Sequence, residues 1–405
     1  MWMVISLPTV RNIVVPGILL SVLLLGCTTS TPGTEGPSKS GETPTTAAEE
    51  TAEVPTPPPA EIEYQVVMQA ADDSVVLVSR DQQIQVLGYP GMTLSNAHAI
   101  TMPAGKTLYV LPDVPSTEES PIHAITGQGI ETLTLNPGQS AQGIVALPGA
   151  DDQPDRLAWS TTTPTEETLE TTLFVSDASG ENQETLLTLS SNDFRTLLPV
   201  RWTSDGSALY YSKQAVGLGG YILFGGYTDL YRLDLETEAD VDMLAGLFDN
   251  AFICLDDIST DYTLVAHHCE GVGVVNITDQ SSIAIEPPNV AYSLLGSVRF
   301  APDGSRVAFA MAAGRGSQAL LEEQGWIAVS DGLTGASHLL ATSEPGSYYE
   351  VLGWLDDQTL LAQLWDLAAA NNSVWTIDVD SGELTLLSNG RFLGVLAMEK
   401  ENEPG

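Results

Sequence analysis

Few side chains in this sequence could take part in catalysis or metal binding. It has three cysteines and five histidines, and the histidines are scattered, at His98, His123, His267, His268 and His338. The sequence contains no Gly-x-Ser-x-Gly nucleophile turn, no His-Glu-x-x-His zinc motif and no P-loop. Its 53 Asp and Glu residues leave one alternative open, a pair of acids that acts on a glycan or peptide. The residue types favour a protein that is not an enzyme and needs no cofactor.

Cys254 and Cys269 flank a turn at Thr260 and Asp261. An antiparallel hairpin would place the two cysteines nearly opposite each other. In an oxidising compartment we expect a disulfide that closes a loop of about 15 residues, worth ~3 kcal/mol in the chain-entropy model. The alternative is a metal site with the two neighbouring histidines, but consecutive histidines on a strand point to opposite faces and a second cysteine pair is missing. We therefore predict no metal site.

A repeated pattern must position these residues. The stretch RWTSDGSALYYS at residues 201–212 returns as RFAPDGSRVAFA at residues 299–310. In each copy an apolar run precedes a tight Asp-Gly turn, and an alternating run rich in aromatic and β-branched residues follows, which indicates a β-hairpin. The turn residues Asp205 and Asp303 are 98 positions apart. This is about twice the 40 to 50 residues of a propeller blade, so a copy is expected between them.

A degenerate turn at Thr260 and Asp261 fills that place, and the same template predicts further turns near Asp73, Gly105, Asp155 and Asp356. A second pair of strands follows most of the hairpins, and no long amphipathic helix is predicted. Four short strands per repeat predict an all-β fold, a β-propeller of four-stranded blades, with seven as the count of turns. Six or eight blades stay open, because either IEYQVVM (62–68) or RFLGVLA (391–397) could supply the strand that closes the ring.

The recurring turn carboxylates are interpreted as structural. The large aromatic residues near the turns are predicted to pack between adjacent blades; they are Trp159, Trp202, Phe300 and Trp354. Ala301 to Gly304 resemble the Ser/Ala-Pro-Asp-Gly hairpin of the TolB-like, WD40-like propeller repeat of bacterial envelope proteins. Thr203 to Gly206 has Ser in place of the proline, and the outer blades match poorly. The resemblance spans roughly residues 62–397 and implies a fold, not an activity.

The N-terminus predicts export. Its apolar stretch, residues 13–25, is interrupted by Pro16 and is shorter than the ~20 residues that a transmembrane helix needs. The sequence LLGC, which ends at Cys27, resembles the lipobox of bacterial lipoproteins. This resemblance implies cleavage of residues 1–26 and lipidation of Cys27, and several acyl chains on one residue give stable anchoring. We therefore expect a location outside the cytoplasm in a bacterial cell envelope, periplasmic or at the cell surface.

The segment after Cys27 differs from the rest of the chain in composition. Residues 28–61 are rich in Thr, Pro, Glu and Gly and have almost no large apolar side chain. Such a segment does not bury enough surface to offset its ordering entropy. We predict a lipidated, disordered tether over residues 27–61, a propeller over 62–398 and a tail over 399–405.

The chain is strongly acidic, with 14 Lys and Arg against 53 Asp and Glu and a formal net charge of −39. Nucleic-acid binding needs basic clusters, which the sequence lacks. Contact of the propeller with an anionic bilayer is disfavoured for the same reason, so the lipid anchor is the expected membrane contact. We interpret the charge as a solubilising surface, and a basic partner or bound cations as the alternative.

The predicted connections between second and third strands are long in four repeats, at residues 112–120, 162–170, 213–227 and 311–325. Equivalent connections of a propeller emerge on one face, so these insertions elaborate one surface. Apolar residues in or beside two of them are predicted to contact a protein or peptide: Leu218, Tyr221, Ile222, Leu223, Phe224, Tyr227, Leu320, Leu321 and Trp326. Alternatively, YILF (221–224) folds back as an extra strand over its own blade.

These patterns together predict a lipid-anchored, non-catalytic propeller that holds a protein partner of the cell envelope or serves as a scaffold there. The alternative is an enzyme outside the cytoplasm that acts on a glycan or peptide with carboxylates at the mouth of the channel. The identity of the partner and the oligomeric state stay open.

Overall fold

The computed structural model describes residues 62–399, except 96–104, 114–120, 134–140, 150–152, 166–167, 194, 216–222, 249–253, 314–323, 368 and 370. The predicted signal peptide, the lipidation site Cys27 and the tether lie outside the described residues. Within the described part of the chain, no helix is long and apolar enough to cross a membrane. The described elements are all strands, and they form seven four-stranded antiparallel sheets.

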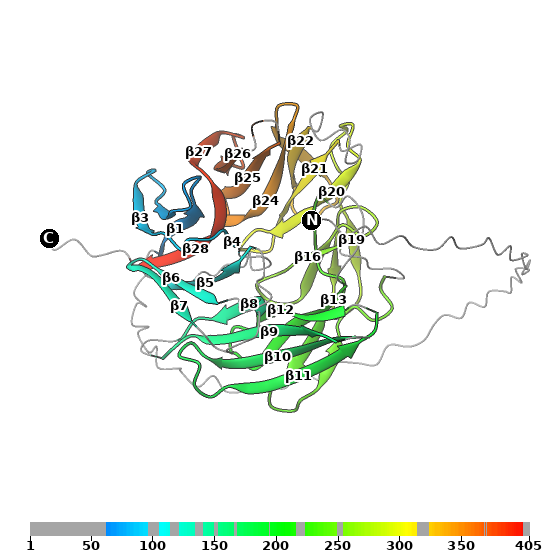
Figure 1. The fold of residues 1–405 in the computed structure, drawn as a ribbon. Coiled ribbons are helices and arrows are strands. Elements are labelled where there is room, and N and C mark those ends of the chain that lie inside the picture. The colour runs from blue at the N-terminus through cyan, green and yellow to red at the C-terminus, as the bar shows by residue number, and fades with distance from the viewer. Residues whose placement is uncertain are drawn as a thin grey trace, which may run out of the picture. The chain divides into compact units, whose positions relative to one another are not determined.

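The sheets are the blades of a β-propeller, arranged around a common axis (Figure 1). Blade 1 contains β28 (Arg391–Glu399), β1 (Ile62–Gln69), β2 (Val75–Val78) and β3 (Ile84–Gly88). Blade 2 contains β4 (Leu94–Ser95), β5 (Thr107–Pro112), β6 (Ile122–Thr126) and β7 (Gly129–Leu133). Blade 3 contains β8 (Ala141–Leu147), β9 (Arg156–Pro164), β10 (Leu169–Asp177) and β11 (Glu184–Ser191). The predicted all-β propeller is confirmed.

The other four blades follow in chain order. Blade 4 contains β12 (Arg195–Trp202), β13 (Ala208–Ala215), β14 (Tyr231–Asp234) and β15 (Asp240–Asp242). Blade 5 contains β16 (Leu255–Ile258), β17 (Leu264–His267), β18 (Gly273–Asn276) and β19 (Ser282–Ala284). Blade 6 contains β20 (Leu294–Phe300), β21 (Val307–Ala312), β22 (Gly325–Ser330) and β23 (Ser337–Thr342). Blade 7 contains β24 (Ser347–Asp356), β25 (Thr359–Asp366), β26 (Asn371–Asp378) and β27 (Leu384–Asn389).

The ring closes between the two ends of the propeller. The last strand, β28, pairs antiparallel with β1, from Ile62 opposite Glu399 to Gln69 opposite Arg391. Both segments that the sequence offered for ring closure are therefore used, side by side in blade 1. Seven blades is the outcome, and the alternatives of six or eight are excluded.

The Asp-Gly turn owes its shape to hydrogen bonds within the turn. The Asp205 carboxylate accepts hydrogen bonds from the backbone N–H of Ser207 at 3.0 Å and from the hydroxyl of Thr203 at 2.7 Å. These bonds lower the pKa of Asp205 to about 2. Gly206 follows with a φ of 68°, a left-handed conformation that favours glycine.

Six of the seven predicted turns join the first and second strands of a blade. The turn at Asp73 does not, so the prediction that it marks the same hairpin is wrong. It joins β1 and β2, which are the second and third strands of blade 1, because β28 supplies the first. The first strand of the propeller in chain order, β1, is therefore the second strand of blade 1.

The aromatic residues predicted between blades lie there. Trp159, Trp202, Phe300 and Trp354 are 1%, 3%, 7% and 2% exposed. The indole N–H of Trp202 donates to the carbonyl of Val145 in blade 3, and that of Trp354 donates to the carbonyl of Arg299 in blade 6. Each tryptophan therefore joins its blade to the preceding one, and truncation to alanine at such a site typically costs about 3–5 kcal/mol.

Candidate functional site

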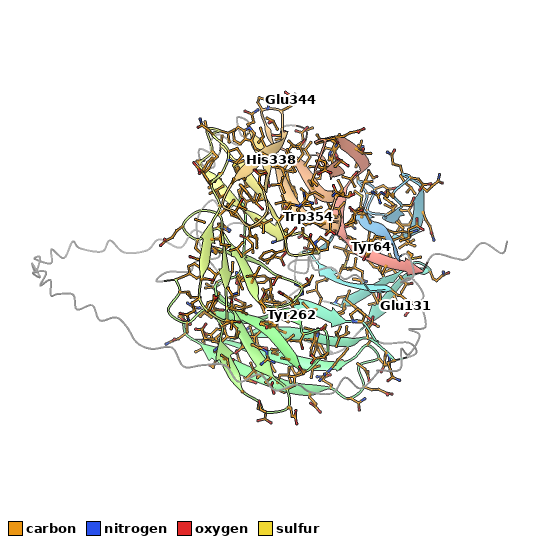
Figure 2. All side chains as sticks on the ribbon, turned by 180° about the vertical axis from the view of Figure 1, so that it is seen from behind. Tyr64, Glu131, Tyr262, His338, Glu344 and Trp354 are labelled. Atoms are coloured by element: carbon orange, nitrogen blue, oxygen red, sulfur yellow. A yellow bond between two sulfur atoms is a disulfide. The ribbon has the colours of Figure 1, made fainter. Side chains whose placement is uncertain are left out.

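The first strands of the blades surround the axis of the ring, and a cavity of about 320 Å³ lies among them. Part of its wall comes from the connections between first and second strands, including Pro148, Ser204 and Tyr262. We call this side of the propeller the turn face, and the opposite side, which carries the long connections between second and third strands, the insertion face. Trp354 of blade 7 and Tyr262 of blade 5, which are labelled in Figure 2, both line the cavity.

The lining is apolar and aromatic. Tyr109, Trp202, Tyr262, Trp354 and Phe392 contribute rings from five blades. Among the described residues around this cavity, Arg201 is the one charged side chain, although the chain carries 53 acids. The cavity therefore differs in charge from the rest of this acidic molecule.

Three of the aromatic rings are stacked by arginines. Arg201 lies over Tyr262 at 5.5 Å from the ring centroid, and Arg306 lies over Trp354 at the same distance. Arg156 lies over Trp202 at 4.8 Å and donates to the carbonyl of Gly206 at 3.1 Å. These cation–π contacts fix the rings that form the wall.

A smaller space of about 30 Å³ adjoins the cavity and shares Arg201, Gly353 and Trp354 with it. We call it the niche. Asp257 and Arg299 complete its charged lining. Arg201, Asp257 and Arg299 are each the second-last residue of the inner strands β12, β16 and β20, so three consecutive blades present them at the same level.

Asp257 is held from both sides. Its carboxylate accepts hydrogen bonds from the backbone N–H of Ile258 at 2.8 Å and from that of Phe300 at 3.0 Å. Desolvation raises the pKa of Asp257, and the charges of Arg299 and Arg201 oppose this rise. Asp257 therefore links blades 5 and 6 and balances part of the arginine charge.

A second polar layer lies at the strand ends toward the insertion face. The carboxylate of Asp256, which is buried, lies 2.7 Å from Nδ1 of His268. Glu350 accepts a hydrogen bond from the indole N–H of Trp365 at 2.9 Å. Burial raises the pKa of Glu350, while this hydrogen bond and the charges of Arg299 and Arg391 lower it. Carboxylates therefore lie on the inner strands β16 and β24, and each contacts a partner within the protein through one oxygen atom. The other oxygen of Asp256, Oδ1, is buried without a hydrogen-bond partner among the described residues.

The predicted cysteine pair lies beside this layer. The sulfur atoms of Cys254 and Cys269 are 2.02 Å apart, at disulfide distance, at the ends of β16 and β17. His267 is buried next to them, and its ring packs edge-on against Phe248. No cluster of three or more His, Cys, Asp or Glu suited to a metal occurs among the described residues.

The apolar residues predicted to contact a partner are in part buried. Phe224 and Trp326 are 5% and 7% exposed, and Leu223 packs beside Phe224 in the core of blades 6 and 7. Tyr227 exchanges two backbone hydrogen bonds with Leu255, the first residue of β16. Phe224 and Trp326 are buried, so the expectation of an exposed contact surface is wrong for these two. Leu223 and Tyr227 are half-buried, and for them partner contact stays a prediction. In the described part of the segment, Phe224 packs into the core of blades 6 and 7, and Tyr227 packs against a cluster that blades 4 and 5 share. Leu223 and Phe224 are not part of a strand.

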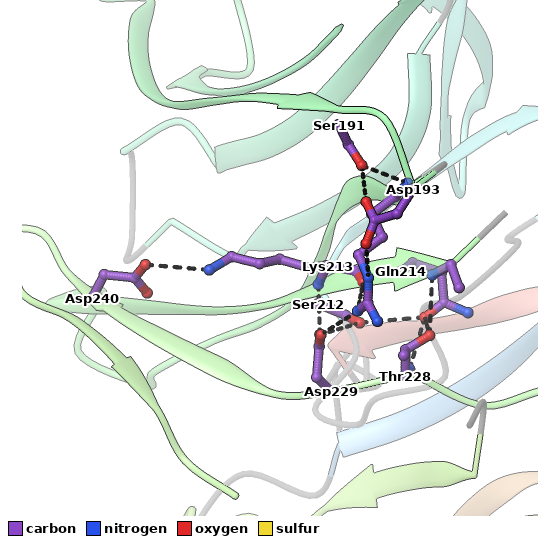
Figure 3. A network of polar contacts seen from close by, with 10 residues as sticks. Ser191, Asp193, Ser212, Lys213, Gln214, Thr228, Asp229 and Asp240 are labelled. Atoms are coloured by element: carbon purple, nitrogen blue, oxygen red, sulfur yellow. Dashed lines mark hydrogen bonds and ion pairs between the residues drawn. The ribbon is translucent and has the colours of Figure 1, made fainter. Parts of the chain in front are cut away.

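Leu218, Tyr221, Ile222, Leu320 and Leu321 lie outside the described residues, so for them partner contact stays a prediction. The two ends of the 213–227 insertion are tied together (Figure 3). Asp229 accepts from the backbone N–H of Lys213 at 2.6 Å and pairs with Arg195 at 3.1 Å. The side-chain carbonyl of Gln214 accepts from the backbone N–H of Thr228 at 2.9 Å.

The arginines of the niche were missed by the sequence reasoning. Arg201 and Arg299 are the first residues of the two repeated stretches, but the prediction from these stretches used only their Asp-Gly turns. In a chain with only 14 Lys and Arg, an arginine at the same position of two repeats is a signal. This recurrence would have predicted two arginine side chains near the axis of the propeller.

Solved structures are similar to this chain at low sequence identity. A protein assigned as TolB from Agrobacterium tumefaciens is 11% identical with a TM-score of 0.41, covering 84% of this chain and 99% of its own. A protein assigned as a 6-phosphogluconolactonase from Bacteroides fragilis is 11% identical with a TM-score of 0.47, covering 85% and 100%. The oligogalacturonate lyase of Vibrio parahaemolyticus is 13% identical with a TM-score of 0.48, covering 80% and 84%. No family model and no curated protein matches the chain.

Proposed function

We propose that this protein is a lipid-anchored β-propeller of a bacterial cell envelope and that it acts outside the cytoplasm. It binds a segment of a protein or peptide partner in its turn-face cavity and does not catalyse a reaction. The cavity carries this proposal. Its volume of about 320 Å³ lies at the lower end of the range for ligand sites. Its aromatic lining is of the kind enriched where proteins bind proteins.

The nature of the lining supports binding over catalysis. The described residues that line the cavity include no histidine, cysteine or carboxylate. General acid–base chemistry needs a titratable group within hydrogen-bonding reach of the substrate. The lining therefore offers shape and aromatic contact but few groups able to move a proton.

Site-specific photo-crosslinking in the living cell tests this proposal. A benzophenone amino acid replaces Ser204, an exposed residue of the cavity wall, or Val241, an exposed residue on the outer strand of blade 4. A third position, Leu218, reports on the insertion. We expect one polypeptide to be captured from position 204 and not from 241, and Trp354→Ala to abolish its capture. Capture from position 218 alone would move the site to the insertion face.

The anchor is tested separately by Cys27→Ser. Without the cysteine no lipid can be attached, so we expect the protein to move from the membrane to the soluble fraction. Cell fractionation with immunodetection measures this. Unchanged membrane retention would overturn the anchor while leaving the binding proposal intact.

One observation favours the enzymatic alternative. Asp257 and Glu350 both have raised pKa values, as general acids often do. Envelope glycans and short peptides are therefore incubated with the wild-type protein and with Asp257→Asn. Product that appears with the wild type and disappears with this variant would replace binding by catalysis as the function.

A further inference from the structure

We infer that the turn-face cavity receives the C-terminal end of a polypeptide, whose last side chain lies among the aromatic residues and whose terminal carboxylate lies in the niche at Arg201 and Arg299. This inference rests on the proposed function, because it names the part of the partner that the same site binds. Four features of the site carry it.

The first feature is an unpartnered donor. The Nε–H of Arg299 is buried and has no hydrogen-bond acceptor among the described residues. The same guanidinium donates from Nη1 to the backbone carbonyls of Asp256 at 2.7 Å and of Val298 at 3.2 Å, so its position is fixed. A buried charged donor is costly to leave without an acceptor. An oxygen that enters with a ligand would satisfy it.

The second feature is the size of the niche. It offers about 30 Å³, and one water-sized atom needs roughly 10–15 Å³ measured in this way. The space therefore fits the two oxygen atoms of one carboxylate. Arginine is the side chain best shaped to hold such a group, through paired N–H donors.

The third feature is the charge of the niche. Arg201 and Arg299 contribute two positive charges, and Asp257 contributes one negative charge when ionised. Glu350 lies outside the lining of the niche, accepts a hydrogen bond from Trp365 and also offsets part of the Arg299 charge. Within the lining itself, the arginine charges exceed the acid charge by one, which favours an anionic ligand group.

The fourth feature is the continuity of the two spaces. Arg201, Gly353 and Trp354 line both the niche and the cavity. A carboxylate in the niche would therefore be attached to an apolar group in the cavity. A polypeptide C-terminus has this combination of groups, and so has a small apolar acid.

Binding of three probes tests the inference on the full chain without its signal peptide. The first two are the peptide acetyl-Ala-Leu-Phe with a free carboxylate and the same peptide as its amide, measured by calorimetry. The third is sodium acetate at constant ionic strength, followed through the NMR signal of the Arg299 Nε–H. We expect the acid to bind at least tenfold more tightly than the amide, and acetate to shift the Arg299 signal saturably.

Two variants and a matched control localise the effect. Arg299→Lys keeps the positive charge but removes the Nε–H, and Arg201→Gln removes a charge shared by niche and cavity. Both should reduce the preference for acid over amide to less than threefold. Arg80→Gln removes one positive charge at a largely exposed site on blade 1 and should leave the preference unchanged. Circular dichroism and melting curves verify that each variant is folded.

The outcomes separate this inference from the proposed function. Equal binding of acid and amide would overturn the carboxylate site and leave peptide binding in the cavity standing. Saturable binding of acetate without binding of either peptide would keep the carboxylate site, replace the polypeptide by a small acid and overturn the proposed function. The absence of any acetate-dependent shift, or a preference that survives in both arginine variants, would overturn the inference outright.

Discussion

His267 makes the stability of this protein depend on pH in a defined window. The ring is buried, and desolvation lowers its pKa to about 4, against the opposing charge of Asp256. An unfolded chain binds a proton on this residue below about pH 6.5, whereas the folded chain does so only near pH 4. The stability contributed is therefore complete above pH 6.5 and lost as the pH falls to 4, by about 3 kcal/mol.

Urea unfolding at pH values from 7 to 4 measures this dependence. His267→Gln should reduce the slope in that window, because glutamine does not titrate, and His123, whose pKa burial also lowers, accounts for part of the slope that is left. His338→Gln, which removes an exposed imidazole on β23 in a different blade, serves as the control. A wild-type slope that persists in His267→Gln would show that the proton uptake belongs to another group.

The cysteine pair gives a second prediction at the scale of residues. Cys254 and Cys269 lie at disulfide distance with a sequence separation of 15. A denatured, non-reduced sample should show no reactive thiol from this pair, and the double variant Cys254→Ser, Cys269→Ser should lose about 3 kcal/mol of stability to urea. A reducing agent should destabilise the wild type but not the double variant. Two titratable thiols in the wild type would show that the bond does not form.

At the scale of strands, β28 should decide whether the ring forms. Its side chain Phe392 is buried against blades 1 and 7, Leu393 and Leu396 are buried against blades 1 and 2, and its backbone pairs with the whole of β1. Loss of one large buried side chain costs about 2–5 kcal/mol, so loss of three matches the roughly 5–15 kcal/mol that holds a domain folded. A chain that ends at residue 390 should therefore lack a cooperative unfolding transition. A chain that ends at residue 399 serves as the control and should unfold like the full protein.

The same scale shows what sequence could reveal. Alternating runs and Asp-Gly turns are local features, so they predicted the hairpins and the blade count. The pairing of β28 with β1 joins segments more than 300 residues apart. No local pattern reveals this pairing, so the alternatives of six or eight blades stayed open from sequence alone. The turn at Asp73 was placed in the wrong class for the same reason.

In the candidate site, too, local features could be predicted from the sequence and contacts between distant segments could not. The tryptophans between blades were predicted, because a large aromatic ring next to a hairpin turn is buried most readily against the neighbouring blade. Phe224 was predicted to contact a partner but is buried, because the sequence of a loop does not reveal which strand ends lie beneath it. The convergence of Arg201, Asp257 and Arg299 depends on the register of three separate blades. The sequence shows only that the two arginines, Arg201 and Arg299, occupy the same position of the repeat.

At the scale of the whole molecule, charge should dominate the response to salt. Even if every Lys and Arg were paired with an acid, 39 carboxylates would have no cationic partner. Their mutual repulsion acts against the compact state. Salt shortens the screening length from about 30 Å at 0.01 M to about 3 Å at 1 M, so it should relieve this repulsion more than it weakens the ion pairs.

We therefore expect the melting temperature to rise by roughly 5 °C or more between 0.01 and 1 M NaCl, because screening favours the folded state of a highly charged chain. Calorimetry measures the rise, and sucrose of equal osmolarity, which does not screen charge, serves as the control. MgCl₂ at matched ionic strength distinguishes two causes. An equal rise would indicate screening alone, whereas a larger rise at millimolar Mg²⁺ would indicate bound cations. A fall of the melting temperature with NaCl would mean that the ion pairs outweigh the repulsion, and the acidic surface would then not limit stability.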